Sequence, residues 1–273
     1  MRFAQPIRHF LLAVQFFTRI PVNGRLAEWV GYSPQMLRAS AAHFPGVGYL
    51  LGGMTGALFC LMGLALPDLA ASPWVAATAA TALGAYLTGA FHEDGLADLA
   101  DGLGGSMDRG RALEIMKDSR IGSFGAVALV LSLLAKVGLL ALLMQALGAV
   151  AATAVLVAAA VVSRFMPLWL IRLLPHVGNE GGSKSKPLAD QISAPALAVA
   201  VLWMLPAAIS LHSVWPSLPW WSGAVGAALA WAWMWRLLAR RLQGFTGDAL
   251  GATQQLCEVF FYLGMVLAWA PGH

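Results

Sequence analysis

Four carboxylates crowd into nine consecutive positions near the middle of the sequence. These residues, Glu93, Asp94, Asp98 and Asp101, lie in the segment 92–102, whereas the whole 273-residue chain has only 13 acidic residues. Like charges at this density destabilise a folded segment unless a cation or a basic side chain neutralises them. The crowding therefore indicates a site for a cation.

If this segment is helical, three of its aspartates lie on one face. Asp94, Asp98 and Asp101 are spaced at i, i+4 and i+7, a spacing that brings side chains together on a helix. Carboxylate oxygens on one face suit Mg²⁺ or Mn²⁺, and Mg²⁺ keeps several waters and binds substrate phosphates. The spacing therefore predicts a site for a divalent cation and a phosphorylated substrate. The simpler alternative is a solvated loop that offsets nearby basic residues, but such a loop does not need the helical register.

The neighbouring residues fit phosphate binding. Gly95 and Gly102 remove side-chain bulk where a phosphate or metal would approach the backbone. Downstream, Lys117 and Arg120 can hold phosphate oxygens, Arg as a planar fork and Lys as a point charge. His92 is either a packing residue at a helix end or a proton carrier, and both interpretations stay open.

The composition places this segment on a membrane protein. Hydrophobic residues make up 59% of the chain and charged residues 11%, and the mean hydropathy is +0.71, which is too apolar for an ordinary soluble domain. The 11 tryptophans and 29 glycines fit helices anchored at the headgroup level and packed closely in a bilayer. The net charge of +4 does not indicate nucleic acid binding, because the basic residues are scattered between apolar runs.

Apolar runs of about 17 to 25 residues predict seven membrane spans. Their approximate positions are 44–66, 73–91, 123–150, 151–174, 194–211, 219–235 and 250–268. Because backbone groups must pair internally in lipid, we expect an all-α, polytopic transmembrane helical bundle. The shorter segment 7–20 carries Arg8, His9 and Arg19, which favours an N-terminal helix at the membrane interface. No repeat or linker divides the chain, so residues 1–273 are predicted to form a single integral membrane domain.

The basic residues predict the orientation of this bundle. Lysine and arginine in short loops favour the cytoplasmic side. With seven spans, the loops near 67–72, 147–151 and 212–219 contain none. The loops on the other side hold Arg2, Arg8, Arg19, Arg25, Arg38, Arg109, Arg111, Lys117, Arg120, Lys184, Lys186, Arg236, Arg240 and Arg241. The N-terminus and the acidic segment are therefore expected to face the cytoplasm.

Some charged residues are expected inside spans, where they face the bundle interior or a watery cavity. For Arg164, a substrate-facing role and an interhelical bridge stay open. Lys136 favours helix pairing or snorkelling, and Glu258 is expected to pair with a glutamine of its own span. The basic segment 179–186 is either a lid over an anionic nucleotide or an ordinary connector.

Five blocks of the sequence resemble the cobalamin synthase family, the adenosylcobinamide-GDP ribazoletransferases of bacteria. They are FFTRIPV at 16–22, HFPGVGYLLGG at 43–53, HEDGLADLADG at 92–102, LEIMKDSRIGSFG at 113–125 and GFTGDALGA at 244–252. The blocks fall at the start, the middle and the end, so the resemblance covers nearly the whole chain.

This resemblance implies a Mg²⁺-dependent enzyme of the bacterial cytoplasmic (inner) membrane. Such an enzyme joins α-ribazole, or its 5′-phosphate, to adenosylcobinamide-GDP, releases GMP and gives adenosylcobalamin or its 5′-phosphate. Carrying the acidic motif over implies Asp94, Asp98 and Asp101 as metal and pyrophosphate ligands. The other implied catalytic residues are Lys117, Asp118, Arg120 and Asp248, and the expected substrate contacts are Gly95, Gly102, Arg164 and His92.

Two other functions are weighed against this one. A CDP-alcohol phosphotransferase would share the pattern Asp98-x-x-Asp101-Gly102, but Gly105 and Ser106 stand where that motif has an Ala-Arg pair. A secondary transporter would share the apolar spans, but its charges belong near the membrane midplane. The sequence leaves open the general base, the number of metal ions, the corrin contacts and whether the chain forms a homo-oligomer.

Overall fold

The computed structural model describes residues 4–177 and 192–269, and these residues are almost entirely helical. The described part has no β-strand, and an isolated backbone bridge joins His176 to Phe245. The prediction of an all-α fold is therefore confirmed. The segment 179–186, predicted as a lid or a connector, lies outside the described residues. The helices are α1 (Ala4–Phe17), α2 (Gly24–Val30), α3 (Pro34–Ser40), the 3₁₀ helix η1 (Ala41–His43), α4 (Phe44–Ala65), α5 (Ser72–Thr88), α6 (Phe91–Gly105), α7 (Arg109–Ile115), α8 (Ser123–Phe165), α9 (Pro167–Leu173), α10 (Ala194–Val214), α11 (Trp220–Arg241) and α12 (Gly247–Ala268).

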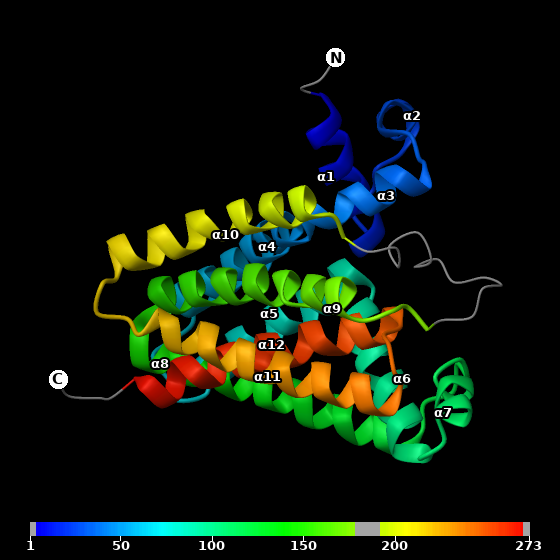
Figure 1. Ribbon diagram of the computed structural model, residues 1–273. Coiled ribbons are helices and arrows are strands. Elements are labelled where there is room, and N and C mark those ends of the chain that lie inside the picture. Colours follow the sequence, from blue (N-terminus) through cyan, green and yellow to red (C-terminus); the bar gives the residue numbers. More distant parts are fainter. Residues whose placement is uncertain (1–3, 178–191, 270–273) are drawn as a thin grey trace.

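The long helices run side by side as a bundle (Figure 1). α8 packs against α4 and α12, and α12 packs in turn against α11 and α6. α11 and α12 approach closely at two glycines, because a Cβ atom at Gly226 would overlap the carbonyl oxygen of Phe260, and one at Gly264 would overlap that of Ser222. Small residues at helix crossings are the usual way to bring helices together without a side chain between them.

α8 is a hairpin of two legs. Gly148 interrupts the helical backbone with φ 77° and ψ 166°, a positive φ that glycine adopts without the cost of a Cβ clash. Figure 1 shows the chain turning back there, so that the two legs of α8 run in opposite directions. The predicted boundary between the third and fourth spans, at residues 150 and 151, lies close to this turn.

Helices occupy all seven predicted span positions, but the count of seven is not confirmed. By length and apolar composition, the described residues contain four segments able to cross a membrane, or up to five if α5 and α6 form one bent span. α5 has 17 residues, the lower limit of the length that crosses the hydrocarbon. α11 carries five tryptophans and three arginines, residues that favour the interface. The four segments are Pro34–Ala65, Ser123–Leu173, Ala194–Val214 and Gly247–Ala268.

α6 does not run parallel to the long helices of the bundle. Gly89 and Ala90 both have left-handed backbones, with φ 66° and φ 57°, and α6 is bent by 88° relative to α5. Figure 1 shows α6 crossing one end of the bundle, beside α7 and the first turn of α12. With 15 residues and the four clustered carboxylates, α6 is too short and too charged to be a span by itself. We therefore treat it as a helix outside the membrane-spanning segments.

The N-terminal helices are attached to this same end. α1 confirms the helix expected within residues 7–20, although its position at a membrane interface stays a prediction. Arg8 Nε donates to the carbonyl oxygen of Val30 at 2.9 Å, which joins α1 to α2. The backbone N–H of Arg19 donates to Leu87 at 2.7 Å, which joins the segment after α1 to the end of α5.

Candidate active site

The acidic helix α6 crosses the first turn of α12, and the predicted distant residue Asp248 lies at this crossing. A Cβ atom at Gly95 would come within 2.8 Å of the carbonyl oxygen of Asp248, and one at Gly251 within 3.3 Å of the Cα of His92. The hydroxyl of Thr246 caps α12 by accepting from the N–H of Ala249 at 3.2 Å, which fixes where the helix begins. We call this crossing of α6 with the start of α12 the acidic junction.

Asp98 is the electrostatic centre of the acidic junction. Its pKa is raised to about 7, first by burial and then by the negative charges of Asp94, Asp248 and Asp101. Each of the charged neighbours that shift this pKa is itself acidic. A cation that enters the junction is therefore stabilised, because it relieves the repulsion among these carboxylates.

Asp101 has a different environment from Asp94 and Asp98. The backbone N–H of Gly122 donates to Asp101 Oδ2 at 2.6 Å, and that of Gly125 donates to Asp101 Oδ1 at 2.8 Å. These groups belong to the first turn of α8, where backbone N–H groups have no partner within the helix and attract negative charge. Asp101 thus caps α8, and any side chain at Gly122 or Gly125 would collide with its carboxylate.

The capping role of Asp101 changes the predicted metal site. Asp94, Asp98 and Asp101 do lie on one continuous helix, as their register predicts. The Asp101 oxygens, however, face the amides of α8, and residues 4–177 and 192–269 contain no group of three His, Cys, Asp or Glu residues arranged to hold a metal ion. A cation at the acidic junction would therefore have fewer than three carboxylate ligands. The candidates are Asp94, Asp98 and Asp248, which act on one another through their charges.

Gly95 and Gly102 serve helix packing in the structure, and their predicted contact with a substrate stays a prediction. The space beside Gly95 is filled by the backbone of Asp248, and a Cβ atom at Gly102 would collide with the side chain of Met116 and lie 2.9 Å from the carbonyl oxygen of Ala112. These glycines let α6 pack directly on α12 and α7. Their absent side chains serve helix packing, which the local sequence alone does not distinguish from substrate access.

Lys117, Asp118 and Arg120 lie after α7, in the exposed segment before α8. Arg120 Nη2 pairs with Asp118 Oδ2 at 2.6 Å, and the Arg120 side chain is 87% exposed. Hydrogen bonds from the side chain and the backbone N–H of Arg120 lower the pKa of Asp118 to about 2. Both residues line an open groove of about 550 Å³ that also reaches Asp101, so this segment adjoins the C-terminal half of α6.

Asp108 and Glu114 are exposed acids that make contacts within α7 and its first turn. Asp108 Oδ1 caps α7 by accepting from the N–H of Arg111 at 2.8 Å. Glu114 pairs with the same arginine at 3.0 Å, and both side chains are 66% exposed. These two acids therefore stabilise the local structure of α7.

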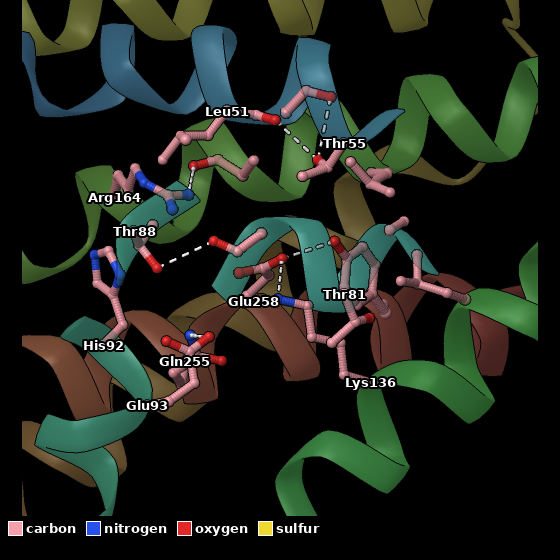
Figure 2. A pocket seen from close by; sticks show the side chains of 17 residues that line it. Leu51, Thr55, Thr81, Thr88, His92, Glu93, Lys136, Arg164, Gln255 and Glu258 are labelled. Atoms are coloured by element: carbon pink, nitrogen blue, oxygen red, sulfur yellow. Dashed lines mark hydrogen bonds and ion pairs between the residues drawn. The ribbon is translucent and has the colours of Figure 1, made fainter. Parts of the chain in front are cut away.

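A second group of charged residues is buried inside the bundle, and Figure 2 shows it around a pocket of about 40 Å³. Lys136 Nζ lies 2.9 Å from Glu258 Oε1, which confirms the predicted helix pairing of Lys136. Gln254 Nε2 donates to Glu258 Oε2 at 2.8 Å, and Tyr262 donates to Oε1 at 3.0 Å. The predicted pair of Glu258 with a glutamine of its own helix is thus confirmed. We call Lys136, Glu258, Gln254 and Tyr262 the buried polar cluster.

Glu93 and Arg164 line the same pocket as Lys136 and Glu258. Glu93 Oε1 accepts from Gln255 Nε2 at 3.0 Å, so the first turn of α6 is held to α12. Arg164 is 9% exposed and donates to the carbonyl oxygen of Ala160, one turn earlier in α8, at 3.0 Å. The sequence places Glu93 among the clustered carboxylates but does not predict its partner, because Gln255 is 162 positions away.

His92 takes a packing position. It is 3% exposed, and its ring stacks on Phe17 with ring centroids 5.9 Å apart and planes at 11°. Of the two interpretations that the sequence leaves open, this geometry favours packing at a helix end over proton transfer in the acidic junction.

The fold and the acidic junction define an α-helical membrane protein with a cluster of acidic side chains at one end of its bundle. The sequence matches the model of the cobalamin-5-phosphate synthase family over residues 9–266. The chain therefore belongs to that family. This confirms the resemblance, and with it the prediction of a transferase of cobalamin synthesis.

Curated relatives agree along almost the full length. The chain is 57% identical to the adenosylcobinamide-GDP ribazoletransferase of Albidiferax ferrireducens, with 97% of this chain and 99% of the relative covered. It is 58% identical to that of Polaromonas naphthalenivorans over the same shares, and 43% identical to that of Vibrio cholerae over 93% of this chain and 91% of the relative. No solved structure shows a significant match.

Proposed function

We propose that this chain transfers the cobinamide phosphate group of adenosylcobinamide-GDP to α-ribazole or α-ribazole 5′-phosphate, with release of GMP. The family and the relatives named adenosylcobinamide-GDP ribazoletransferase support this reaction. The structural observation that carries it is the acidic junction, where Asp98 lies among acids from both α6 and α12. A cluster of this kind suits a diphosphate that arrives with a divalent cation.

The reaction breaks one P–O bond and forms another. An oxygen of the acceptor attacks the phosphorus bonded to the cobinamide arm, and the bond from that phosphorus to the GMP oxygen breaks. If the acceptor is a hydroxyl, its proton passes to an aspartate of the acidic junction. Negative charge builds on the phosphate oxygens during the transfer, so fixed positive charge nearby lowers the barrier. Lys117 and Arg120, in the segment beside α6, supply such charge.

Mg²⁺ is the cofactor that this donor set fits. Asp94, Asp98 and Asp248 offer hard carboxylate oxygens, and no more than two of them are needed, because Mg²⁺ takes its other ligands from water and substrate phosphates. When bound, Mg²⁺ neutralises charge on the diphosphate and eases departure of the leaving phosphate. Asp101 is not required as a ligand in this arrangement, since its oxygens already accept two backbone N–H groups.

The same end of the bundle is proposed to face the cytoplasm of a bacterial cell. Basic side chains at this end include Arg19, Arg109, Arg111, Lys117 and Arg120, whereas residues 66–71 and 215–219 at the opposite end contain no lysine or arginine. This asymmetry follows the positive-inside rule. In spheroplasts, a membrane-impermeant thiol reagent should leave Lys117→Cys unlabelled and should label Asp68→Cys, and the reverse pattern would place the acidic junction outside the cell.

The proposed reaction is tested by measuring GMP release from adenosylcobinamide-GDP and α-ribazole with purified membranes. The wild-type chain should release GMP only when both substrates and Mg²⁺ are present, and chelation with EDTA should stop the reaction. Asp98→Asn should reduce turnover by about a hundredfold to a thousandfold, the loss typical of removing a key transition-state contact. Asp68→Asn, in the exposed α4–α5 loop at the opposite end, serves as the control. Unchanged turnover in Asp98→Asn would refute the assigned site.

A further inference from the structure

A second pocket, lined largely by aromatic rings, lies beside the acidic junction. Its walls include Phe16 and Phe17 from the end of α1, Phe44 from the start of α4 and Phe91 from the start of α6. Phe17 makes edge contacts with Phe44, with ring centroids 4.3 Å apart, and with Phe91 at 5.8 Å. The phenylalanines thus form an apolar, aromatic wall. We call this pocket the aromatic pocket.

Two residues that line the aromatic pocket each have a buried side-chain atom without a hydrogen-bond partner among the described residues. These atoms are Arg164 Nε, a donor, and Gln254 Oε1, an acceptor. Arg164 is 9% exposed and Gln254 is 2% exposed. A buried polar atom without a partner costs free energy, so these two atoms indicate a ligand that offers one acceptor and one donor.

The aromatic pocket adjoins the acidic junction in space. Its lining includes Gly247 and Gly251 from the first turns of α12, and Gly247 is the residue before Asp248. His92, which also lines the pocket, comes two residues before Asp94 on α6. A molecule with its flat apolar part in this pocket can therefore reach the junction with an attached polar arm.

We propose that the aromatic pocket binds the benzimidazole base of the acceptor, so that its ribose reaches the acidic junction. This inference rests on the proposed reaction, in which α-ribazole, the riboside of 5,6-dimethylbenzimidazole, is the acceptor. The base is planar and largely apolar and has one free ring nitrogen, which accepts from Arg164 Nε. A ribose hydroxyl donates to Gln254 Oε1.

The chemistry of the lining favours this base over the guanine of the donor. Guanine carries several donors and acceptors around its ring, and burying them without partners is costly. The polar side chains that line the aromatic pocket are His92, Arg164 and Gln254, and the remaining lining residues are phenylalanines, leucine, proline and glycines. Dimethylbenzimidazole leaves only one ring nitrogen to satisfy, and its methyl groups bury apolar surface.

The aromatic pocket is narrow, about 40 Å³, so it admits a flat group more readily than a bulky one. One wall belongs to α1, which Figure 1 shows at the edge of the bundle. Insertion of a base therefore displaces Phe16 and Phe17 outward with α1, while the walls from α4, α6 and α12 stay in place.

The test uses full-length protein in membranes and measures KM separately for the two substrates. Phe17→Leu and Phe91→Leu each remove a ring and keep an apolar side chain. Loss of one aromatic contact should raise the KM for α-ribazole up to about tenfold, with the KM for adenosylcobinamide-GDP changed less than about twofold. Phe10→Leu is the matched control, because Phe10 also lies on α1 but stacks on Trp203, with ring centroids 5.8 Å apart, and does not line the pocket.

A competition experiment separates base binding from a structural role. Free 5,6-dimethylbenzimidazole should inhibit competitively against α-ribazole, and the inhibition constant should rise in Phe17→Leu and Phe91→Leu by the same factor as the KM for α-ribazole. If both variants instead raise only the KM for adenosylcobinamide-GDP, or change neither KM, the proposal is wrong. Equilibrium dialysis of wild-type membranes with 5,6-dimethylbenzimidazole tests the pocket even if GMP release fails, so the two proposals fail separately.

Discussion

The acidic junction and the buried polar cluster both concentrate ionisable side chains, but they neutralise charge in opposite ways. In the cluster, Glu258 is matched by Lys136 at 2.9 Å and receives two further hydrogen bonds. In the junction, Asp98 is surrounded by Asp94, Asp248 and Asp101. A group of charges that is balanced within the protein stabilises the fold, whereas a group of one sign is stable only with a cation from outside. We therefore assign a structural role to the buried polar cluster, whose charges balance, and a functional role to the acidic junction, whose charges do not.

The largest expected effect is in the buried polar cluster. Glu258→Gln leaves the Lys136 ammonium without its counter-charge inside the bundle, which should lower the free energy of unfolding by about 3–5 kcal/mol. The measurement is loss of folded protein on heating in detergent. The double variant Lys136→Met with Glu258→Gln removes the stranded charge and should recover part of the loss. If the double variant is no more stable than Glu258→Gln, Lys136 and Glu258 do not neutralise each other's charge as proposed.

The next largest effect is expected at Asp101, which belongs to α6 but caps α8. Asp101→Asn removes the charge and one of the two acceptors for the N–H groups of Gly122 and Gly125. Stability should fall by about 1–3 kcal/mol, while turnover per folded molecule stays within a fewfold of wild type. Thermal unfolding and GMP release on the same preparation check both parts. Loss of turnover without loss of stability would restore Asp101 to the set of metal ligands.

Asp101 also shows which parts of the site the sequence could predict. The helical register of Asp94, Asp98 and Asp101 is a local property, and it was predicted. The partners of Asp101, Gly122 and Gly125, are 21 and 24 positions away, and no local pattern distinguishes their backbone amides from any others. The packing of Gly95 on Asp248 could not be predicted either, because these two residues are also far apart in the sequence. Resemblance to the family singled out Asp248, which spacing alone would have missed.

The sequence predicted the fold to about the same extent as it predicted the site. Apolar runs located the long helices, and the turn at Gly148 came close to the predicted boundary. The number of spans was harder to predict, because the tryptophans and arginines of α11 reduce its apolar character although this helix packs along α12. The bend between α5 and α6 depends on two left-handed residues, one of which is Ala90. An alanine gives no signal for such a backbone.

A smaller effect of opposite sign is expected at Asp98. Its folded pKa of about 7 lies above the ordinary 3.8, so folding favours the protonated form, and stability falls as the pH rises from about 4 to about 7. At pH 8 and without divalent cations, Asp98→Asn should therefore have a free energy of unfolding higher than that of wild type by roughly 1–2 kcal/mol, once solvent screening is allowed for. The measurement is a higher unfolding temperature. The difference should vanish near pH 4. This variant gains stability and loses turnover, whereas Glu258→Gln loses stability. If Asp98→Asn is less stable than wild type at pH 8, the carboxylates of the acidic junction do not repel one another as proposed.

The smallest effect is expected at Arg120, which is exposed and paired with Asp118 in the open groove beside the acidic junction. Because exposed charges act weakly across solvent, Arg120→Gln should leave stability unchanged and lower kcat/KM for adenosylcobinamide-GDP by about threefold. Raising the salt concentration should erase the difference, since added ions screen exposed charges. Arg25→Gln, on the exposed surface of α2, is the matched control and should show neither change. If Arg120→Gln instead lowers turnover a hundredfold at all salt concentrations, Arg120 contacts the diphosphate directly, and the acidic junction extends across the groove to the segment after α7.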